Sequence, residues 1–297
     1  MKRIHLAGGC FWGLEHYLKN IGGVLSTEVG FANGNLDSPT YEQVYTDTTG
    51  FAETVAVSYD PSILPLKELL EDYFCAIDPY SVNKQGEDEG TRYRTGIYYS
   101  DPEELPVIEA VCGSVGGPLA VEVCPLRNFF PADERHQEYL SKNPGGYCHL
   151  PLKIFRYAVL ATDMKNLLGD ETDAVARMAN ASALLKERMG FFWAGLYLVK
   201  DGALVLGPFQ GPVACTRIGY GKGVCGTAWK EARTIVVPDV EEFPGHIACS
   251  SESKSEIVIP LTLPDGSVKG VLDIDSDRVG SFDGIDAHWL GRIAALV

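Results

Sequence analysis

The spacing of apolar residues changes character part-way along this chain, and this change constrains the fold more than any other feature. In the first half, short apolar or alternating segments that are typical of strands alternate with segments of helical spacing. The second half opens with a long helical pattern over 171–189, followed by strand patterns and a closing helix after Asp283. The 297 residues exceed the roughly 100–200 of one domain. We therefore predict an α+β protein of two domains, 1–157 and 165–297, joined within 155–169, where neither pattern is strong.

Charge and hydropathy exclude several classes of partner. The chain has 40 acidic and 25 basic residues, a net charge of −15, and neither half has an excess of bases. Because phosphate backbones and anionic lipids bind positive surfaces, we expect no nucleic-acid or membrane partner. No run approaches the ~18 apolar residues of a membrane-spanning helix. His5, Gly8 and Glu15 interrupt the first apolar segment, so we expect no signal peptide and a cytoplasmic protein.

The eight cysteines are informative, because cytoplasmic thiols stay reduced and lasting disulfides are rare there. No two of them form a Cys-x-x-Cys pair, so the sequence lends little support to a zinc site and we predict no metal. The cysteines are then either small buried hydrophobes or redox-active groups. Cys75, Cys112 and Cys124 are predicted to belong to the core.

One cysteine lies in a setting that favours reactivity. The segment Gly8-Gly9-Cys10-Phe11-Trp12-Gly13 follows a short predicted strand and opens a predicted helix. Amides and the macrodipole at a helix N-terminus stabilise an anion, which predicts a stabilised Cys10 thiolate. Glu53 shares strand parity with Val55 and Val57, so burial should raise its pKa and keep it protonated near neutrality. The alternatives are a buried cysteine in a Gly-rich turn and a solvated edge glutamate.

The first half resembles the methionine sulfoxide reductase A family over about residues 1–155. The matching stretches, in the family's order, are Gly9-Cys10-Phe11-Trp12-Gly13, Pro39-Thr40-Tyr41, Gly50-Phe51-Ala52-Glu53, Ile77-Asp78-Pro79, Asn83-Lys84-Gln85-Gly86, Asp88-x-Gly90, Tyr93-Arg94-Thr95, His136-Gln137 and Asn143-Pro144-Gly145-Gly146-Tyr147-Cys148-His149. Glu87, Arg92 and Tyr80 stand where the family often has Asn, Gln and Thr. Glu87 and Arg92 flank expected site residues, so they affect the detailed shape of the pocket rather than the reaction.

The resemblance implies a two-layer α/β sandwich of the ferredoxin-like plait, and reduction of the S epimer of methionine sulfoxide, free and in proteins. By this resemblance Cys10 attacks the sulfoxide sulfur, Glu53 supplies a proton to its oxygen, and the sulfenic acid condenses with Cys148. The implied substrate-binding residues are Phe11 and Trp12 as a cage for the methyl group, and Tyr41, Asp88 and Tyr93 for the sulfoxide oxygen and water.

The second half contains three cysteines in loop-like segments, Cys215, Cys225 and Cys249. Loops carry functional residues and expose thiols, but spacing alone does not separate redox chemistry from a structural role.

Strand parity in the second half places several functional side chains on common faces. Trp193 and Tyr197 share one face of a predicted strand, and Asp273 and Asp275 share one face of another. Two acids at i and i+2 repel each other when buried alone, so a cationic partner is expected. With Glu256 they would form a cup of carboxylates for an ammonium group. A solvated sheet face is the alternative.

Residues 165–297 resemble the free methionine-(R)-sulfoxide reductases, an enzyme branch of the GAF fold, in which helices flank an antiparallel sheet. The matching stretches include Asn180-Ala181-Ser182-Ala183-Leu184-Leu185, Trp193-Ala194-Gly195-Leu196-Tyr197, Gly221-Lys222-Gly223-Val224-Cys225-Gly226, Gly245-His246-Ile247-Ala248-Cys249 and Gly270-Val271-Leu272-Asp273-Ile274-Asp275-Ser276. The resemblance implies Cys249 as nucleophile, Cys215 as main resolving thiol and Cys225 as auxiliary. The implied substrate-binding residues are Trp193 and Tyr197 for the methyl group, and Glu256, Asp273 and Asp275 for the amino group.

Taken together, the two resemblances imply a fusion of reductases with opposite stereochemistry, without metal or organic cofactor. Each turnover would end in a disulfide that thioredoxin or another dithiol reduces by exchange. Two alternatives stay open: the second half is a sensor that binds free methionine sulfoxide and regulates the first, or the first half is a thiol peroxidase. A homodimer through the GAF domain also stays open.

Overall fold

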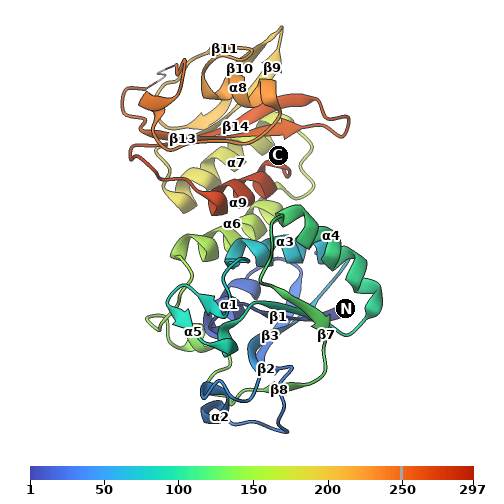
Figure 1. The fold of residues 1–297 in the computed structure, drawn as a ribbon. Coiled ribbons are helices and arrows are strands. Elements are labelled where there is room, and N and C mark those ends of the chain that lie inside the picture. Colours follow the sequence, from blue (N-terminus) through green and yellow to red (C-terminus); the bar gives the residue numbers. More distant parts are fainter. Residues whose placement is uncertain (248–249) are drawn as a thin grey trace. The chain divides into compact units, whose positions relative to one another are not determined.

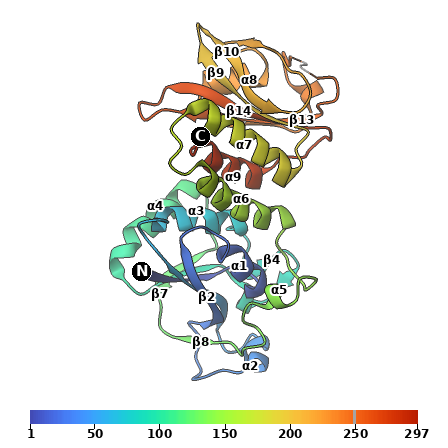
Figure 2. The same cartoon turned by 180° about the vertical axis from the view of Figure 1, so that it is seen from behind.

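The computed structural model describes residues 1–247 and 250–297, and the chain forms two compact units, Met1–Val159 and Leu160–Val297 (Figures 1 and 2). The division between them falls inside helix α6 (Leu152–Leu168). The sequence pattern missed this helix because apolar residues occur on its exposed side as well as its buried side. Leu152, Val159 and Leu167 are exposed, so the sequence lacks the single apolar stripe of an amphipathic helix.

The first unit is built on a mixed sheet with the strand order β7-β6-β1-β3-β2-β8, in which β6 and β7 are parallel and the other pairs antiparallel. Its elements are β1 (Lys2–Ala7), α1 (Phe11–Leu18), β2 (Val24–Ala32), α2 (Tyr41–Tyr45), β3 (Ala52–Tyr59), α3 (Leu66–Ala76), β4 (Lys84–Gln85), β5 (Asp88–Glu89), β6 (Gly96–Tyr99), α4 (Leu105–Val115), β7 (Glu122–Pro125), β8 (Phe129–Pro131) and α5 (Tyr139–Lys142). The central order β6-β1-β3-β2, with α1 after β1 and α3 after β3, confirms the expected plait.

Two buried layers meet in this unit. Ile4 and Leu6 of β1 and Val55 and Val57 of β3 are fully buried at the centre of the sheet. The hydroxyl of Tyr17 in α1 donates to the backbone carbonyl of Asp72 in α3 at 3.0 Å, so these helices lie side by side. In this sandwich, the start of α1 lies next to the end of β1.

The second unit is an antiparallel sheet with the order β11-β10-β9-β14-β13-β12, which confirms the expected GAF fold. Its elements are α7 (Ala174–Met189), β9 (Trp193–Lys200), β10 (Ala203–Gln210), β11 (Arg217–Gly219), α8 (Gly223–Glu231), β12 (Ile235–Val237), β13 (Ser255–Thr262), β14 (Val268–Ser276) and α9 (Gly284–Ala294). Helices α7 and α9 cover one face, and α8 covers the other (Figures 1 and 2). Trp289, Leu290 and Ile293 of α9 are buried, so this short closing helix packs fully.

Two expectations about cysteines need correction. Cys75 in α3 and Cys112 in α4 are half-buried rather than core residues. Cys124 in β7 is half-buried too, but it packs against a core cluster that includes Ala7 and Tyr98.

Cys225, expected in a loop, lies in helix α8 and is buried. The sequence signal for a loop came from Gly221, Gly223 and Gly226. In the structure, these glycines let the helix approach its neighbours closely. A Cβ atom at Gly226 would lie 2.4 Å from the carbonyl oxygen of Gly219.

Gly226→Ala should therefore lower stability. The backbone oxygen cannot rotate away, so the helix must shift, and such overpacking costs about 1–3 kcal/mol. Gly291→Ala in α9 is the matched control, because a Cβ atom there meets nothing within 4 Å and alanine favours a helix by about 0.5–1 kcal/mol. Urea unfolding of the full chain measures both. Equal effects of the two substitutions would contradict the close approach.

No helix in the described part of the chain has the length and apolar content needed to cross a membrane.

Two candidate active sites

The first candidate site lies where β1 ends and α1 begins. Cys10 occupies the N-cap position of α1, and its side chain is buried. Gly9 before it has a φ of +75°, and a Cβ atom there would lie 2.7 Å from Cβ of Gln85 and 3.0 Å from the ring of His149. A larger residue at position 9 would be both strained and obstructed. Glycine thus allows the tight turn that sets Cys10 at the helix start.

Glu53 of β3 approaches the same helix start. The backbone N–H of Phe11 donates to Oε2 of Glu53 at 3.1 Å, and the Glu53 side chain is 1% exposed. Burial raises the pKa of Glu53 to about 8, while the Phe11 amide and the Arg92 guanidinium oppose the rise. The expected desolvation is present, so at neutral pH the carboxyl keeps its proton. A buried acid beside a thiol is equipped to donate a proton.

The expected stabilisation of the Cys10 thiolate does not hold in this structure. Burial raises the pKa of Cys10 well above its ordinary value, and the neighbouring Glu53 carboxylate raises it further. The backbone N–H of Trp12 acts in the opposite direction, as the helix N-terminus was expected to, but desolvation is the larger effect. Desolvation of a group at a helix end is not visible in the sequence.

Aromatic side chains form an open cavity of about 510 Å³ beside these residues. Trp12 stacks on His136 and on Tyr139, with ring centroids 5.8 and 3.8 Å apart, and Tyr41 stacks on His136 at 4.6 Å. Phe11 is fully buried, 6.4 Å from the Trp12 ring. The structure therefore gathers Phe11, Trp12 and Tyr41. It adds His136 and Tyr139, for which the sequence indicated no role.

The Gly-rich tail brings Cys148 to the first turn of α1. A Cβ atom at Gly13 would lie 2.8 Å from Sγ of Cys148, and both Cys10 and Cys148 are free thiols. Two neighbours of Cys148 hold the tail on Asp88. The hydroxyl of Tyr147 donates to Oδ1 of Asp88 at 2.9 Å, and Nδ1 of His149 lies 3.5 Å from Oδ2. Sequence reasoning named Cys148 and Asp88 but not Tyr147 and His149, which connect them.

Arg92 has a defined place in this pocket. Its guanidinium lies over the rings of Tyr45 and Tyr93, at 4.2 and 4.3 Å, and forms an ion pair with Asp47. Its positive charge lowers the pKa of Glu53, against the larger effect of burial. Burial raises the pKa of Tyr41 to about 12 and raises that of Tyr93 as well, so both hydroxyls remain donors.

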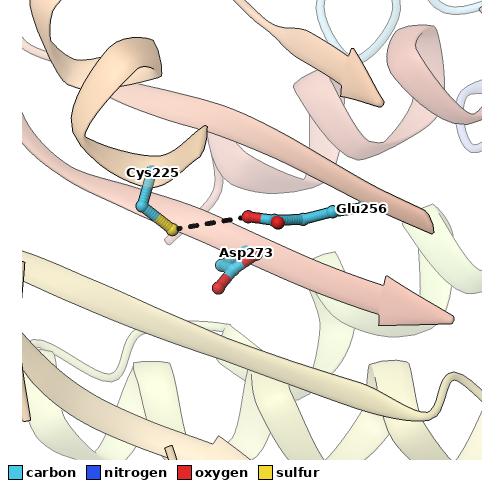
Figure 3. Close-up of side chains that lie close together, drawn as sticks. All are labelled: Cys225, Glu256 and Asp273. Atoms are coloured by element: carbon cyan, nitrogen blue, oxygen red, sulfur yellow. Dashed lines mark hydrogen bonds between the residues drawn. The ribbon is translucent and has the colours of Figure 1, made fainter. Parts of the chain in front are cut away.

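The second candidate site lies on the face of the sheet under α8. Asp275 pairs with Trp193 on one side and with Glu256 on the other, and Asp273 pairs with Gly195. Residues directly opposite each other point to the same face, so the three acids share it with Trp193 and Tyr197, as parity predicted. Sγ of Cys225, from α8, lies 3.8 Å from Oε1 of Glu256 (Figure 3).

The aromatic pair packs against the segment that carries Cys215. The Trp193 and Tyr197 rings stack at 6.1 Å. Nε1 of Trp193 donates to the carbonyl oxygen of Pro212 at 3.0 Å. The hydroxyl of Tyr197 donates to the carbonyl oxygen of Cys215, also at 3.0 Å. Cys215 is disulfide-bonded, and Cys225 is a free thiol. The predicted nucleophile Cys249 lies outside the described residues.

The three acids line one cavity, in agreement with the cup of carboxylates that the sequence predicted. A cavity of about 30 Å³ is lined by Glu256, Asp273 and Asp275 together with Cys225 and His246. Burial, with repulsion from Asp273, raises the pKa of Glu256 well above its ordinary value. Burial, with repulsion from Asp275, does the same to the pKa of Asp273. The pKa of Asp275 rises to about 6 through burial. Such crowded carboxyls favour a cationic partner.

Comparison with known proteins places the first unit in a family. Residues 2–167 match the family model of the peptide methionine sulfoxide reductases. The chain belongs to this family. A peptide methionine sulfoxide reductase of Clostridium acetobutylicum is 51% identical over 160 residues, which cover 52% of this chain and 99% of that protein.

This member of the family also carries a GAF domain, matched over residues 171–297. GAF domain-containing protein A of Dictyostelium discoideum is 55% identical over 143 residues, covering 48% of this chain and 90% of that protein. A solved structure of the free methionine-R-sulfoxide reductase of Neisseria meningitidis is 51% identical, with a TM-score of 0.46, and covers 47% of this chain and 84% of its own. The expected fusion of a methionine sulfoxide reductase A domain with a GAF domain is confirmed.

Proposed function

We propose that residues 1–157 reduce the S epimer of methionine sulfoxide, free and in proteins, and that residues 165–297 reduce the free R epimer. For the first site, the observation that carries the proposal is a free thiol, Cys10, at the same helix start as the buried, protonated Glu53. For the second, it is the cup of buried carboxylates beside an aromatic pair, which suits a small zwitterion with an ammonium group and an apolar end.

At the first site, Cys10 attacks the sulfoxide sulfur while Glu53 donates a proton to the departing oxygen. The substrate S–O bond and the new bond between the two sulfurs then break as the hydroxyl passes to Sγ of Cys10. The substrate sulfur, reduced by two electrons, leaves as methionine, and Cys10, oxidised by two electrons, becomes a sulfenic acid. The thiol of Cys148 then displaces water from that acid and forms a disulfide. Phe11 and Trp12 surround the substrate methyl group, and Tyr41, Asp88 and Tyr93 bind the sulfoxide oxygen and water.

At the second site, Cys249 is the nucleophile that attacks the sulfoxide. Cys215 is the main resolving thiol, which reacts with the resulting sulfenic acid, and Cys225 is an auxiliary thiol. Trp193 and Tyr197 receive the methyl group, and Glu256, Asp273 and Asp275 bind the ammonium group. A peptide bond converts this ammonium into an amide, which removes its positive charge. Protein-bound R sulfoxide is therefore rejected.

Both disulfides are reduced by thiol–disulfide exchange with thioredoxin or a similar dithiol, and neither site uses an organic cofactor. The dependence on a dithiol donor fits the cytoplasm, where such donors are kept reduced. We also propose that the chain forms a homodimer through the GAF domain. Sedimentation of the full chain measures its oligomeric state.

The deciding experiment incubates free methionine-(R,S)-sulfoxide with dithiothreitol and the full chain, and separates the epimers by chiral chromatography. Cys10→Ser should lose reduction of the S epimer and keep that of the R epimer. Cys249→Ser should show the reverse. An R epimer that persists in every sample overturns the second activity and indicates a sensor. Rapid consumption of peroxide by wild type but not Cys10→Ser, without sulfoxide reduction, indicates a thiol peroxidase.

A further inference from the structure

We propose that Cys225, Glu256 and Asp273 form a binding site for Zn²⁺ in the GAF unit. Figure 3 shows the three side chains converging from α8, β13 and β14. One ligand atom from each lies within 4.8 Å of the other two. All three residues are buried, so the site is built into the fold rather than spread over an acidic surface.

The spacing suits a tetrahedral metal. Zinc lies about 2.3 Å from a thiolate sulfur and about 2.0–2.2 Å from a carboxylate oxygen, so such ligand atoms are about 3.6 Å apart. Sγ of Cys225 and Oε1 of Glu256 are 3.8 Å apart. Small side-chain movements would bring the third ligand to the same distance.

Asp273 supplies an observation independent of the clustering of acids. Its side chain is 6% exposed, and Oδ1 has no hydrogen-bond partner among the described residues. A buried carboxylate oxygen without a donor is costly, because it has lost water and gained nothing in return. Asp273 lines the cavity, where a cation would satisfy this oxygen.

The cavity has room for an ion and its water. Its interior of about 30 Å³ exceeds the roughly 10–15 Å³ that one water molecule needs, so Zn²⁺ with a bound water fits between the three side chains.

The donor set selects the metal. A thiolate favours Zn²⁺ over Mg²⁺ and Ca²⁺, which prefer oxygen ligands alone. His246 lines the same cavity, with Nε2 3.9 Å from Oε2 of Glu256, and its side chain would have to move to supply a fourth ligand. A dication would also relieve the repulsion among the buried acids.

Direct titration with Zn²⁺ tests the site without any sulfoxide, and therefore independently of the proposed function. The full chain carries Cys10→Ser and Cys148→Ser, which removes the thiols of the other site, and is reduced with a phosphine. Zn²⁺ is titrated against a chromophoric chelator, and Co²⁺ reports thiolate coordination by its charge-transfer absorption. We expect one ion per chain.

Cys225→Ser and Asp273→Asn should each weaken Zn²⁺ binding by more than the roughly 10–100-fold that loss of an outer-shell partner costs. Cys225→Ser should also abolish the charge-transfer band. Cys112→Ser is the matched control, which removes a thiol of the first unit and should leave binding unchanged. Undiminished binding in Cys225→Ser, or its loss in Cys112→Ser, overturns the proposal.

Folding is checked by the melting temperature without metal. If Cys225→Ser does not fold, Asp273→Asn, which keeps the side-chain shape and removes one crowded charge, decides the question. In the chain with Cys10→Ser and Cys148→Ser, which keeps the second site intact, Zn²⁺ should raise the KM for the free R epimer. Zinc binding without this competition supports the metal site and overturns the placement of the substrate ammonium in the same cup.

Discussion

Glu53→Gln should lower the rate of S-epimer reduction by roughly 10²–10⁴-fold, the usual contribution of a positioned general acid. Glutamine keeps the size and polarity of the side chain but has no proton to donate, so substrate affinity should change little. Single-turnover measurements with free methionine-(S)-sulfoxide separate the chemical step from recycling. An unchanged rate would remove Glu53 from the mechanism.

The pH dependence gives this prediction a second readout. The wild-type rate should stop rising with pH above about 8, because Glu53 loses its proton there while the high pKa of Cys10 still lets the thiolate fraction grow. The glutamine variant should lack this break. The raised pKa also acts on stability. Between the ordinary value of 4.5 and about 8, Glu53 is protonated in the folded protein and ionised in the unfolded chain. Its contribution to stability should therefore fall across this range, and the stability difference between wild type and Glu53→Gln should change with pH. A constant difference would contradict the raised pKa.

Asp273→Asn should lower kcat/KM for the free R epimer by roughly 150- to 4,000-fold. Removing one member of a buried charge pair costs about 3–5 kcal/mol, because the remaining charge is left buried without its partner. Here the remaining charge is the ammonium group of the bound substrate. Steady-state kinetics of the full chain, with the S-epimer rate as an internal control, measure the loss.

N-acetylmethionine sulfoxide is the matched substrate for this variant, because acetylation removes the ammonium charge. Wild type should reduce its R epimer poorly, and Asp273→Asn should cause little further loss. Together the two substrates and two proteins form a cycle that isolates the contact between ammonium and carboxylate. An equal loss on both substrates would assign Asp273 a structural role instead.

Much of the fold follows from local pattern. Alternating residues identified β3 and β14, and Asp173 and Gly190 mark the start and end of α7 by capping and by a left-handed turn. The helix α6 was missed for a physical reason. Apolar residues occur on both its buried and its exposed side, so the sequence shows no single apolar stripe of helical period.

The features of each site that depend only on neighbouring residues could be predicted from the sequence. A strand that ends in Gly8-Gly9 must turn before α1, which sets Cys10 at a helix start, and the two-residue period sets Asp273 and Asp275 on one face. Only the tertiary structure decided what surrounds these groups. Burial outweighs the helix N-terminus at Cys10, and α8 brings Cys225 over Glu256 and Asp273. Desolvation and contacts between distant elements depend on packing in three dimensions, and neither residue type nor spacing records them.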